Sequence, residues 1–246
     1  MIRRPPRSTL DRSSAASDVY KRQIISLNRP EHINAFNVQM RDDLYQYLRL
    51  FQDDQEAKIA VIRGNGVRGF CAGADLSEFG TAPSQTIARH VRWARDLWGL
   101  FMSIDKPIIA SLHGFVIGSG IEIASLCDVR IAANDARFRM PEVALGMIPA
   151  AGGTQTLPRL IGVDKTMDLI LTNKEIDADE ARLIGLVDMV VEPKNIYNET
   201  VSVAQNILSN GEKLNSAIKS VVRLGFEMDI NSAVLFESRR AGTFLG

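Results

Sequence analysis

The stretch PIIASLHGFVIGSGIEIASLCDVRIAA, residues 107–133, decides the fold. It starts with an apolar, β-branched run, turns through three glycines, continues in small apolar residues and ends in a second apolar run. This order is typical of a buried strand, a buried helix and another buried strand. The first part has the roughly 20-residue length of a membrane span, but His113 and the lone carboxylate of Glu122 would be costly in a bilayer. We therefore expect a buried core segment and no membrane partner.

The residues before this stretch continue the alternation of strands and helices. Short β-branched runs at 24–28 and 58–64 are typical of strands, and the apolar residues between them recur at helical spacing. Apolar residues from Ile87 to Phe101 share one helical face, which predicts a single long helix that starts near Ser84.

The residues after it are mostly helical in pattern. From about residue 152 onward the only strand that we predict is the late apolar run at 187–191. Repeated strand and helix units before a helical tail predict an α/β fold, with a core domain over residues 24–190 and a smaller helical part over residues 191–246.

The first 23 residues, MIRRPPRSTLDRSSAASDVYKRQ, differ from the rest of the chain. They show neither helical nor strand periodicity, and six basic residues against two aspartates give them a net charge of +4. Because the whole chain is neutral, residues 24–246 carry −4. The segment resembles a translated adapter or vector sequence, with a targeting segment as the alternative, and we exclude it from the fold.

Composition favours a small-molecule partner. The 246 residues are 46% hydrophobic and have no net charge, which suits one sizeable core and argues against a general electrostatic grip on nucleic acid. Cys71 and Cys127 lie in apolar surroundings without metal-ligand spacing, so we expect buried free thiols and a reducing, cytoplasmic location.

Two glycine-rich segments could present backbone NH groups to a ligand. In FCAGADL, residues 70–76, small residues lead from a strand into a helix that we expect Asp75 to cap. Residues 118–120, Gly-Ser-Gly, stand at a predicted helix N-terminus, where NH groups are unpaired and the helix dipole is positive. An NH group from each would suit a thioester oxygen that gains negative charge, although glycines at simple turns would give the same pattern.

Two glutamates accompany these segments. Glu122 lies three residues after Ser119, about one helical turn on, so its carboxylate is expected beside the same NH groups. Glu142 follows a proline in a run with little charge, and two carboxylates near one oxyanion site could share proton transfer. The alternative is that each is a buried structural carboxylate paired with one of three nearby arginines. These arginines are Arg130, Arg137 and Arg139.

Four segments together resemble the enoyl-CoA hydratase/isomerase (crotonase) superfamily. They are LNRPEHINAFN (27–37), FCAGADLSEF (70–79), HGFVIGSGIEIASLCDVRIAANDARF (113–138) and PEVALGMIPAAGGTQTLPRLIG (141–162). The resemblance implies a spiral of ββα units with a helical C-terminal trimerisation part, assembled as a homotrimer or homohexamer. It also implies acyl-CoA thioesters as substrates and no metal or redox cofactor, the coenzyme A being part of the substrate.

Matched residue by residue, the resemblance assigns roles to particular positions. The oxyanion NH groups fall on Ala74 and Ser119, and the two catalytic glutamates of the hydratases fall on Glu122 and Glu142. The positions that would line the CoA and acyl path are Ala72, Gly73, Ala74, Asp75, Leu76 and Gly118.

The pair of glutamates favours hydration of a 2-enoyl-CoA to a 3-hydroxyacyl-CoA, because many relatives with other activities keep only one of the two acids. The alternatives are an isomerase, decarboxylase or thioester hydrolase with the same oxyanion hole, or a non-catalytic RNA-binding relative. The charge of −4 after residue 23 argues against RNA binding.

The chain departs from the family pattern at several points. Ser119 replaces a common glycine, which leaves its backbone NH available, and His32 replaces a lysine near the CoA. The three histidines, His32, His90 and His113, have no metal-ligand spacing, so we expect them to be structural or surface residues. Residues 1–23 stand where relatives have a first strand, and the tail ends before their last helical stretch, so a fragment is expected.

Overall fold

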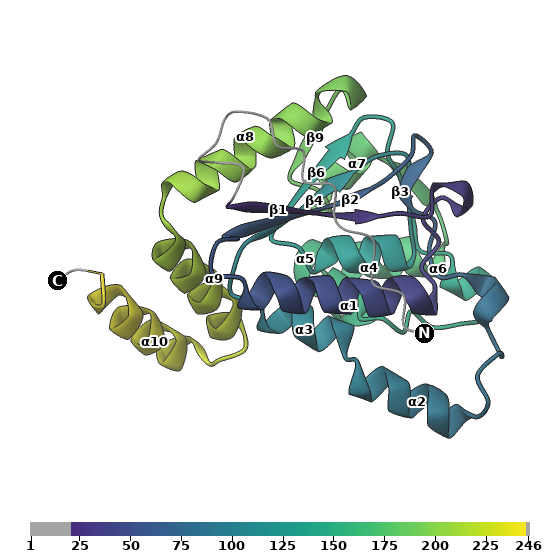
Figure 1. Ribbon diagram of the computed structural model, residues 1–246, viewed down its shortest axis with the longest axis horizontal. Helices are drawn as coiled ribbons and strands as arrows, with labels where there is room; N and C mark the ends of the chain where they lie inside the picture. Colours follow the sequence, from purple (N-terminus) through teal and green to yellow (C-terminus); the bar gives the residue numbers. More distant parts are fainter. Residues whose placement is uncertain (1–20, 245–246) are drawn as a thin grey trace, which may run out of the picture.

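The computed structural model describes residues 21–244, and Figure 1 shows the arrangement of its elements. Residues 1–20 of the predicted foreign segment therefore lie outside the described residues. The first strand, β1, covers Arg22–Leu27, two residues more than predicted at its N-terminal end, and Arg22 and Gln23 pair in register with the next strand. The sheet thus takes in the last residues of the segment that we had excluded.

The strands form two sheets, and the chain alternates between them. The larger sheet has the order β1-β2-β4-β6-β9 and is parallel throughout. The smaller sheet has the order β3-β5-β7-β8, parallel except for its last pair. The remaining strands are β2 Ile59–Gly64, β3 Gly69–Cys71, β4 Ile108–Leu112, β5 Phe115–Ile117, β6 Val129–Ala133, β7 Arg137–Arg139, β8 Glu175–Asp177 and β9 Met189–Val191.

The stretch that decides the fold forms the predicted strand, helix and strand, and also a short strand, β5, that had not been predicted. Strand β4 leads through β5 into helix α4, Ser119–Ser125, and the chain returns in β6. All five residues of β4 and four of the five residues of β6 are buried, as expected for parallel strands covered on both faces. Helix α4 is buried along most of its length, so this segment forms the centre of the core.

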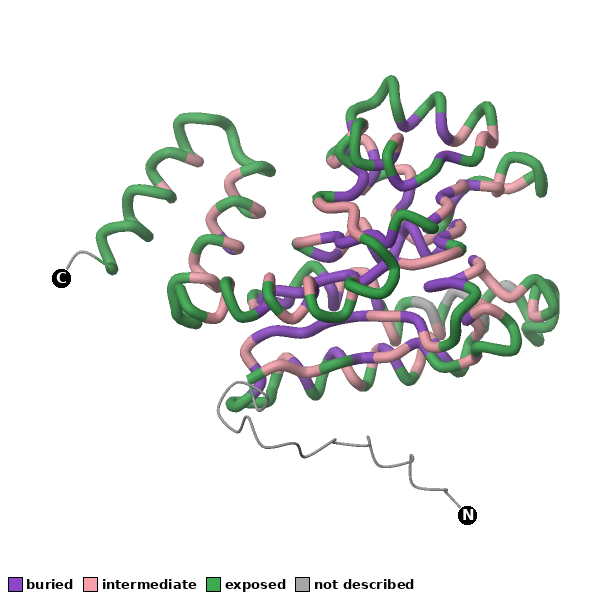
Figure 2. Tube along the Cα trace, turned by 90° about the horizontal axis from the view of Figure 1, so that it is seen from above, coloured by how far each residue is buried: buried purple, intermediate pink, exposed green. Residues whose placement is uncertain are grey.

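Helices cover both faces of the larger sheet (Figure 1). Helix α8, Ile196–Ser209, packs on one face against β2, β4 and β6. Helices α1, Val38–Asp53, and α3, Leu97–Ser103, lie on the other face together with α4. Figure 2 shows the buried residues concentrated between these layers. The other helices are α2 Gln85–Ala94, α5 Gly153–Ile161, α6 Val163–Leu171, α7 Ala178–Leu183, α9 Glu212–Phe226 and α10 Ile230–Gly242.

The prediction of one long helix after Ser84 was wrong, because the chain forms α2 and α3 with a break between them. Arg95 leaves the helical conformation, and the side chain of Asp96 accepts a hydrogen bond from the NH of Gly99 at 3.0 Å. An aspartate in this position starts a new helix, since its side chain replaces the missing backbone acceptor. Trp98 on α3 packs near the rings of Phe36 and Phe101.

The helices of the C-terminal part differ in how closely they pack against the main body. The predicted strand at 187–191 is confirmed as β9, which covers only Met189–Val191, whereas the three-residue strand β8 had not been predicted. Helix α8 belongs to the main body, and ion pairs of Lys219 with Asp128 and of Glu212 with Lys58 join α9 to it. Helix α10 packs on α9 and extends away from the main body (Figure 1). Helix α10 has no buried residue. Within the described residues, no helix is both long enough and apolar enough to span a membrane.

Candidate active site

Three parallel strands of the smaller sheet direct three loops to one edge. Strands β3, β5 and β7 run side by side, and the carboxyl ends of parallel strands meet at the same edge of a sheet. The chain leaves them into residues 72–76, 118–119 and 140–142. The segments that the sequence analysis singled out therefore converge, although they are up to about 70 residues apart in sequence.

The first loop is held by backbone pairing to the turn around Phe36. The NH of Phe36 donates to the Gly73 carbonyl at 2.7 Å, and the NH of Asp75 donates to the Phe36 carbonyl at 3.0 Å. Ala74 lies between these two bonds, and within the described residues its own NH donates to no protein acceptor. The predicted oxyanion donor is thus a fixed backbone NH group without a protein partner.

The side chain of Asp75 has a structural task. It caps the short 3-10 helix Leu76–Glu78 and accepts hydrogen bonds from the NH and hydroxyl of Ser77 at 3.1 and 2.6 Å. It also forms an ion pair with Arg29 at 3.0 Å. The hydrogen bonds from Ser77 and the guanidinium of Arg29 lower the pKa of Asp75 below its ordinary value. The predicted cap is confirmed, although it starts a 3-10 helix, and Leu76 is half exposed beside it.

The second loop requires glycine at position 118. Gly118 has φ 49° and ψ −112° and precedes helix α4, while its NH donates to the Arg139 carbonyl at 2.9 Å. A β-carbon at this position would lie 2.9 Å from Oε1 of Glu142 and 3.8 Å from Cα of Gly73. This places the first two loops and Glu142 around one small space. Ser119, the first residue of α4, directs its NH out of the helix end, as predicted for the second donor.

Glu122 lies on the buried side of α4 and is only 2% exposed. Its Oε1 accepts hydrogen bonds from the backbone NH groups of Ala151 and Gly153, both at 3.0 Å. Gly153 is the first residue of α5, so the carboxylate also faces the positive end of that helix. These contacts compensate the burial of a charged group. The sequence analysis missed both donors, and the signal that could have found them is the glycine pair at 152–153 before a helical pattern.

The arginines proposed as structural partners of the glutamates have other contacts. Arg130 forms an ion pair with Asp188 at 2.9 Å, and Arg139 donates through Nε to the side-chain oxygen of Asn173 at 2.9 Å. Arg137 donates to the carbonyl of its neighbour Ala136.

Glu142 begins the short 3-10 helix Glu142–Leu145 directly after Pro141. One carboxylate oxygen, Oε1, faces Gly118, and the other, Oε2, is buried and has no hydrogen-bond partner among the described residues. Burial raises the pKa of Glu142 above its ordinary value, and the negative charge of Glu122 raises it further. The site thus holds two carboxylates that interact electrostatically. Glu122 has two amide donors, and Glu142 is partly desolvated.

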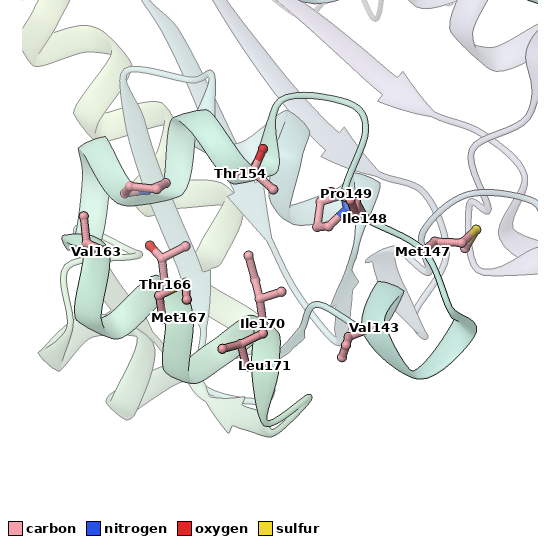
Figure 3. Close-up of a pocket in the computed structure, with 11 residues that line it drawn as sticks. Val143, Met147, Ile148, Pro149, Thr154, Val163, Thr166, Met167, Ile170 and Leu171 are labelled. Carbon is pink, nitrogen blue, oxygen red and sulfur yellow. The ribbon is translucent and has the colours of Figure 1, made fainter.

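An apolar groove of about 250 Å³ is lined by Val143, the residue that follows Glu142 in sequence, and had not been predicted (Figure 3). Val143, Met147 and Ile148 contribute from the segment after Glu142, and helices α5 and α6 form the other walls. Several large apolar side chains that line this groove are exposed together, among them Ile148, Val163 and Leu171, which are 77%, 63% and 59% exposed.

The remaining candidate residues have structural environments. Cys71 and Cys127 are confirmed as buried free thiols, and burial raises the pKa of each to about 12. The ring of His113 contacts the Gly66 carbonyl at 2.8 Å, whereas His32 and His90 are exposed. Residues 21–244 contain no group of three or more His, Cys, Asp or Glu side chains placed to hold a metal ion.

The chain alternates between two sheets, and loops at one edge of the smaller sheet bring backbone NH groups close to two carboxylates. This arrangement defines an α/β protein of the crotonase fold. The chain belongs to the enoyl-CoA hydratase/isomerase family, whose model matches residues 23–244. It is 36% identical to the short-chain-enoyl-CoA hydratase of Clostridium acetobutylicum, over 89% of this chain and 84% of that protein. It is 35% identical to the crotonyl-CoA hydratase of Syntrophomonas wolfei, over 90% of this chain and 85% of that protein.

Solved structures give the same result. An enoyl-CoA hydratase from Bacillus anthracis superposes with a TM-score of 0.85 at 32% identity, covering 90% of this chain and 86% of that chain. A putative enoyl-CoA hydratase from Thermobifida fusca, solved in complex with CoA, superposes with a TM-score of 0.84 at 28% identity, covering 92% of this chain and 90% of that chain. The predicted family and fold are therefore confirmed.

Proposed function

We propose that this protein catalyses the reversible hydration of a 2-enoyl-CoA thioester to a 3-hydroxyacyl-CoA. The observation that carries the proposal is the meeting of Glu122 and Glu142 at the edge where Gly73 and Gly118 approach one another. Two acids beside backbone NH donors supply what addition of water to a conjugated thioester needs. The names of the hydratase relatives support the same reaction.

The proposed oxyanion hole consists of the NH groups of Ala74 and Ser119. Both would donate to the thioester oxygen, which gains negative charge when water attacks the β-carbon. The loop from Ala72 to Leu76 and Gly118 would line the path of the CoA and the acyl chain. In other enzymes the loss of one such donor costs about 10²- to 10³-fold in rate.

The two glutamates would then complete the addition. Glu122, fixed by two amide donors, positions a water molecule and takes one of its protons as the oxygen bonds to the β-carbon. Glu142 delivers a proton to the α-carbon, a role that suits its raised pKa. Glu122 ends the step protonated and Glu142 ionised, and one proton returns through solvent. The addition of water needs no external oxidant or reductant, and the proposed NH donors would stabilise the charge on the thioester oxygen, so we propose a reaction without a redox cofactor or metal.

We also propose that the protein assembles as a homotrimer, or as two such trimers. Helices α9 and α10 carry large exposed apolar residues, among them Val222, Phe226 and Ile230, which are 67%, 67% and 74% exposed. Neighbouring copies would cover this surface through a head-to-tail contact that closes into a ring. Light scattering after gel filtration tests this, and a monomeric parent protein would refute it. The buried free thiols fit an enzyme of a reducing compartment such as the cytoplasm.

The test of the reaction is the ultraviolet absorbance of the conjugated thioester in crotonyl-CoA. We expect decay with the parent enzyme and about 10²- to 10⁴-fold lower kcat in Glu122→Gln and in Glu142→Gln. Glu175→Gln is the matched control, because Glu175 is exposed on β8 of the same sheet; it is expected to match the parent.

Two results would contradict the proposal. An inactive parent that still binds CoA would point to a different thioester reaction. Activity that persists when either glutamate is replaced would favour an isomerase or a thioester hydrolase that needs only one acid. An assay with a 3-enoyl-CoA would identify an isomerase, and detection of the free CoA thiol would identify a hydrolase.

A further inference from the structure

Glu122 is connected at both ends to the same turn of the chain. At its side-chain end, Oε1 accepts from the NH groups of Ala151 and Gly153. At its main-chain end, the Glu122 carbonyl lies 2.8 Å from the hydroxyl of Ser125, which is the last residue of α4. The Ser125 hydroxyl also contacts the helix that follows the turn at residues 151–153, which holds the carboxylate.

The second half of this connection is the hydroxyl of Thr156 on α5. It lies 2.7 Å from the Ser125 hydroxyl and 3.1 Å from the carbonyl of Gly152. Two hydroxyl protons serve three contacts, so three arrangements exist, and two of them contain a hydrogen bond between Ser125 and Thr156. Either Ser125 donates to Glu122 and Thr156 donates to Ser125, or Ser125 donates to Thr156 and Thr156 donates to Gly152. In the third, Ser125 donates to Glu122 and Thr156 donates to Gly152, but the 2.7 Å between the two hydroxyl oxygens is the usual distance of an O–H···O hydrogen bond and favours the first two.

We propose that Ser125 and Thr156 are positioning residues that clasp α4 to the turn at 151–153 and thereby fix the carboxylate of Glu122 for the attack of water. The inference rests on the proposed hydration. The turn contains Gly152 at φ 98°, a residue whose backbone has wide conformational freedom, whereas α4 is buried along most of its length. A bond between them therefore restricts motion that the backbone alone would allow.

The bond between the two helices distinguishes this pair from ordinary helical hydroxyls. Serine and threonine often donate to a carbonyl three or four residues earlier, which has only a local effect. Thr172, the residue directly after α6, makes such a bond to the carbonyl of Asp168 at 2.6 Å. Ser125 and Thr156 add a contact across 31 residues, between the helix that carries Glu122 and the helix that begins with its amide donor.

The kinetic test replaces each hydroxyl separately. Ser125→Ala and Thr156→Val are expected to lower kcat for crotonyl-CoA about 5- to 20-fold, with KM within twofold, because the thioester contacts are untouched. Thr156→Ser keeps the hydroxyl and is expected to retain kcat within about twofold. In a Glu122→Gln enzyme, Thr156→Val should have little further effect, because the pair acts through Glu122. Thr172→Val is the matched control with unchanged kcat.

A second measurement does not depend on catalysis. Amide hydrogen exchange at Ala151 and Gly153 should be about tenfold faster in Thr156→Val than in the parent or in Thr172→Val. An inactive parent would refute the proposed hydration, whereas unchanged exchange would refute the clasp, so the two failures are read from different measurements. Loss of thermal stability with unchanged kcat would also overturn the positioning role.

Discussion

Gly153 offers the sharpest test of how the active site is built. Its NH donates to Oε1 of Glu122, and it lacks a side chain at a crowded point. A β-carbon there would lie 2.9 Å from Cε of Met140, 3.0 Å from Oε1 of Glu122 and 3.2 Å from its Cγ. The end of Met140 can turn aside, but the carboxylate is held by two amides. We therefore predict that Gly153→Ala displaces the carboxylate of Glu122.

The size of the effect follows from these distances. Ordinary contacts of a β-carbon begin near 3.4 Å, so Oε1 must move by about 0.4 Å. If a misplacement of about 1 Å costs roughly 10²-fold, this shift costs roughly 6-fold in kcat. Weakening the amide hydrogen bond by about 1 kcal/mol adds roughly another 5-fold. We expect kcat between about 6- and 30-fold below the parent, with KM near the parent value because Ala74 and Ser119 are unchanged.

Crotonyl-CoA hydration under saturating and limiting substrate gives kcat and KM separately. Gly225→Ala is the control, because a β-carbon at this position on α9 would meet only Cβ of Ala233, at an ordinary 3.7 Å. It is expected to leave kcat unchanged and to stabilise the helix by about 0.5–1 kcal/mol. A folded Gly153→Ala enzyme with kcat within twofold of the parent would show that the position of Glu122 does not limit the reaction.

Three further predictions concern stability. The raised pKa of Glu142 means that the folded state binds its proton more tightly, so stability falls as the pH rises through and above the ordinary range of a glutamate. Glu142→Gln should therefore melt at a higher temperature than the parent at pH 8 but not at pH 3, and equal shifts at both would contradict this. Asn34→Ala removes a fully buried amide that serves three backbone groups, and urea unfolding should show a loss of about 2–3 kcal/mol; a loss below about 1 kcal/mol would contradict it. Asp188→Asn leaves the guanidinium of Arg130 poorly paired and should cost about 2 kcal/mol in the same assay without changing kcat, whereas a loss of kcat would connect this pair to the site.

Local pattern was sufficient for the central part of the fold. The strand, helix and strand of residues 107–133 could be predicted because every step has its own signal: β-branched runs for buried strands and glycines for the turn. The same signals indicated the loops that contain Ala74 and Ser119, whereas the choice of these two residues as oxyanion donors rests on the family resemblance and stays a prediction. Short-range sequence patterns were thus sufficient to identify loops that lie at the edge of the smaller sheet.

The failures have physical causes in competing interactions. The periodicity of residues 84–101 continues through Asp96, but a single side chain-to-NH bond is enough to start a second helix there. Strand β8 has three residues and one buried side chain, too few for a periodic signal, and it exists because it pairs with β7. The partners of Glu122 are about 30 residues away in sequence, so the glycine pair at 152–153 could indicate backbone donors but only the folded chain shows that they bind Glu122.

The different surroundings of the two glutamates explain why one sequence feature, a carboxylate in an apolar run, can lead to two proposed roles. Glu122 is more deeply buried, yet its Oε1 has two amide donors, so its position is determined by the backbone. Glu142 is less buried but has a desolvated oxygen without a hydrogen-bond partner among the described residues, which raises its pKa. A fixed acceptor suits the alignment of water, and an acid that holds its proton suits delivery to carbon. The proposed assignment of base and acid therefore rests on the amide donors of Glu122 and on the desolvated oxygen of Glu142.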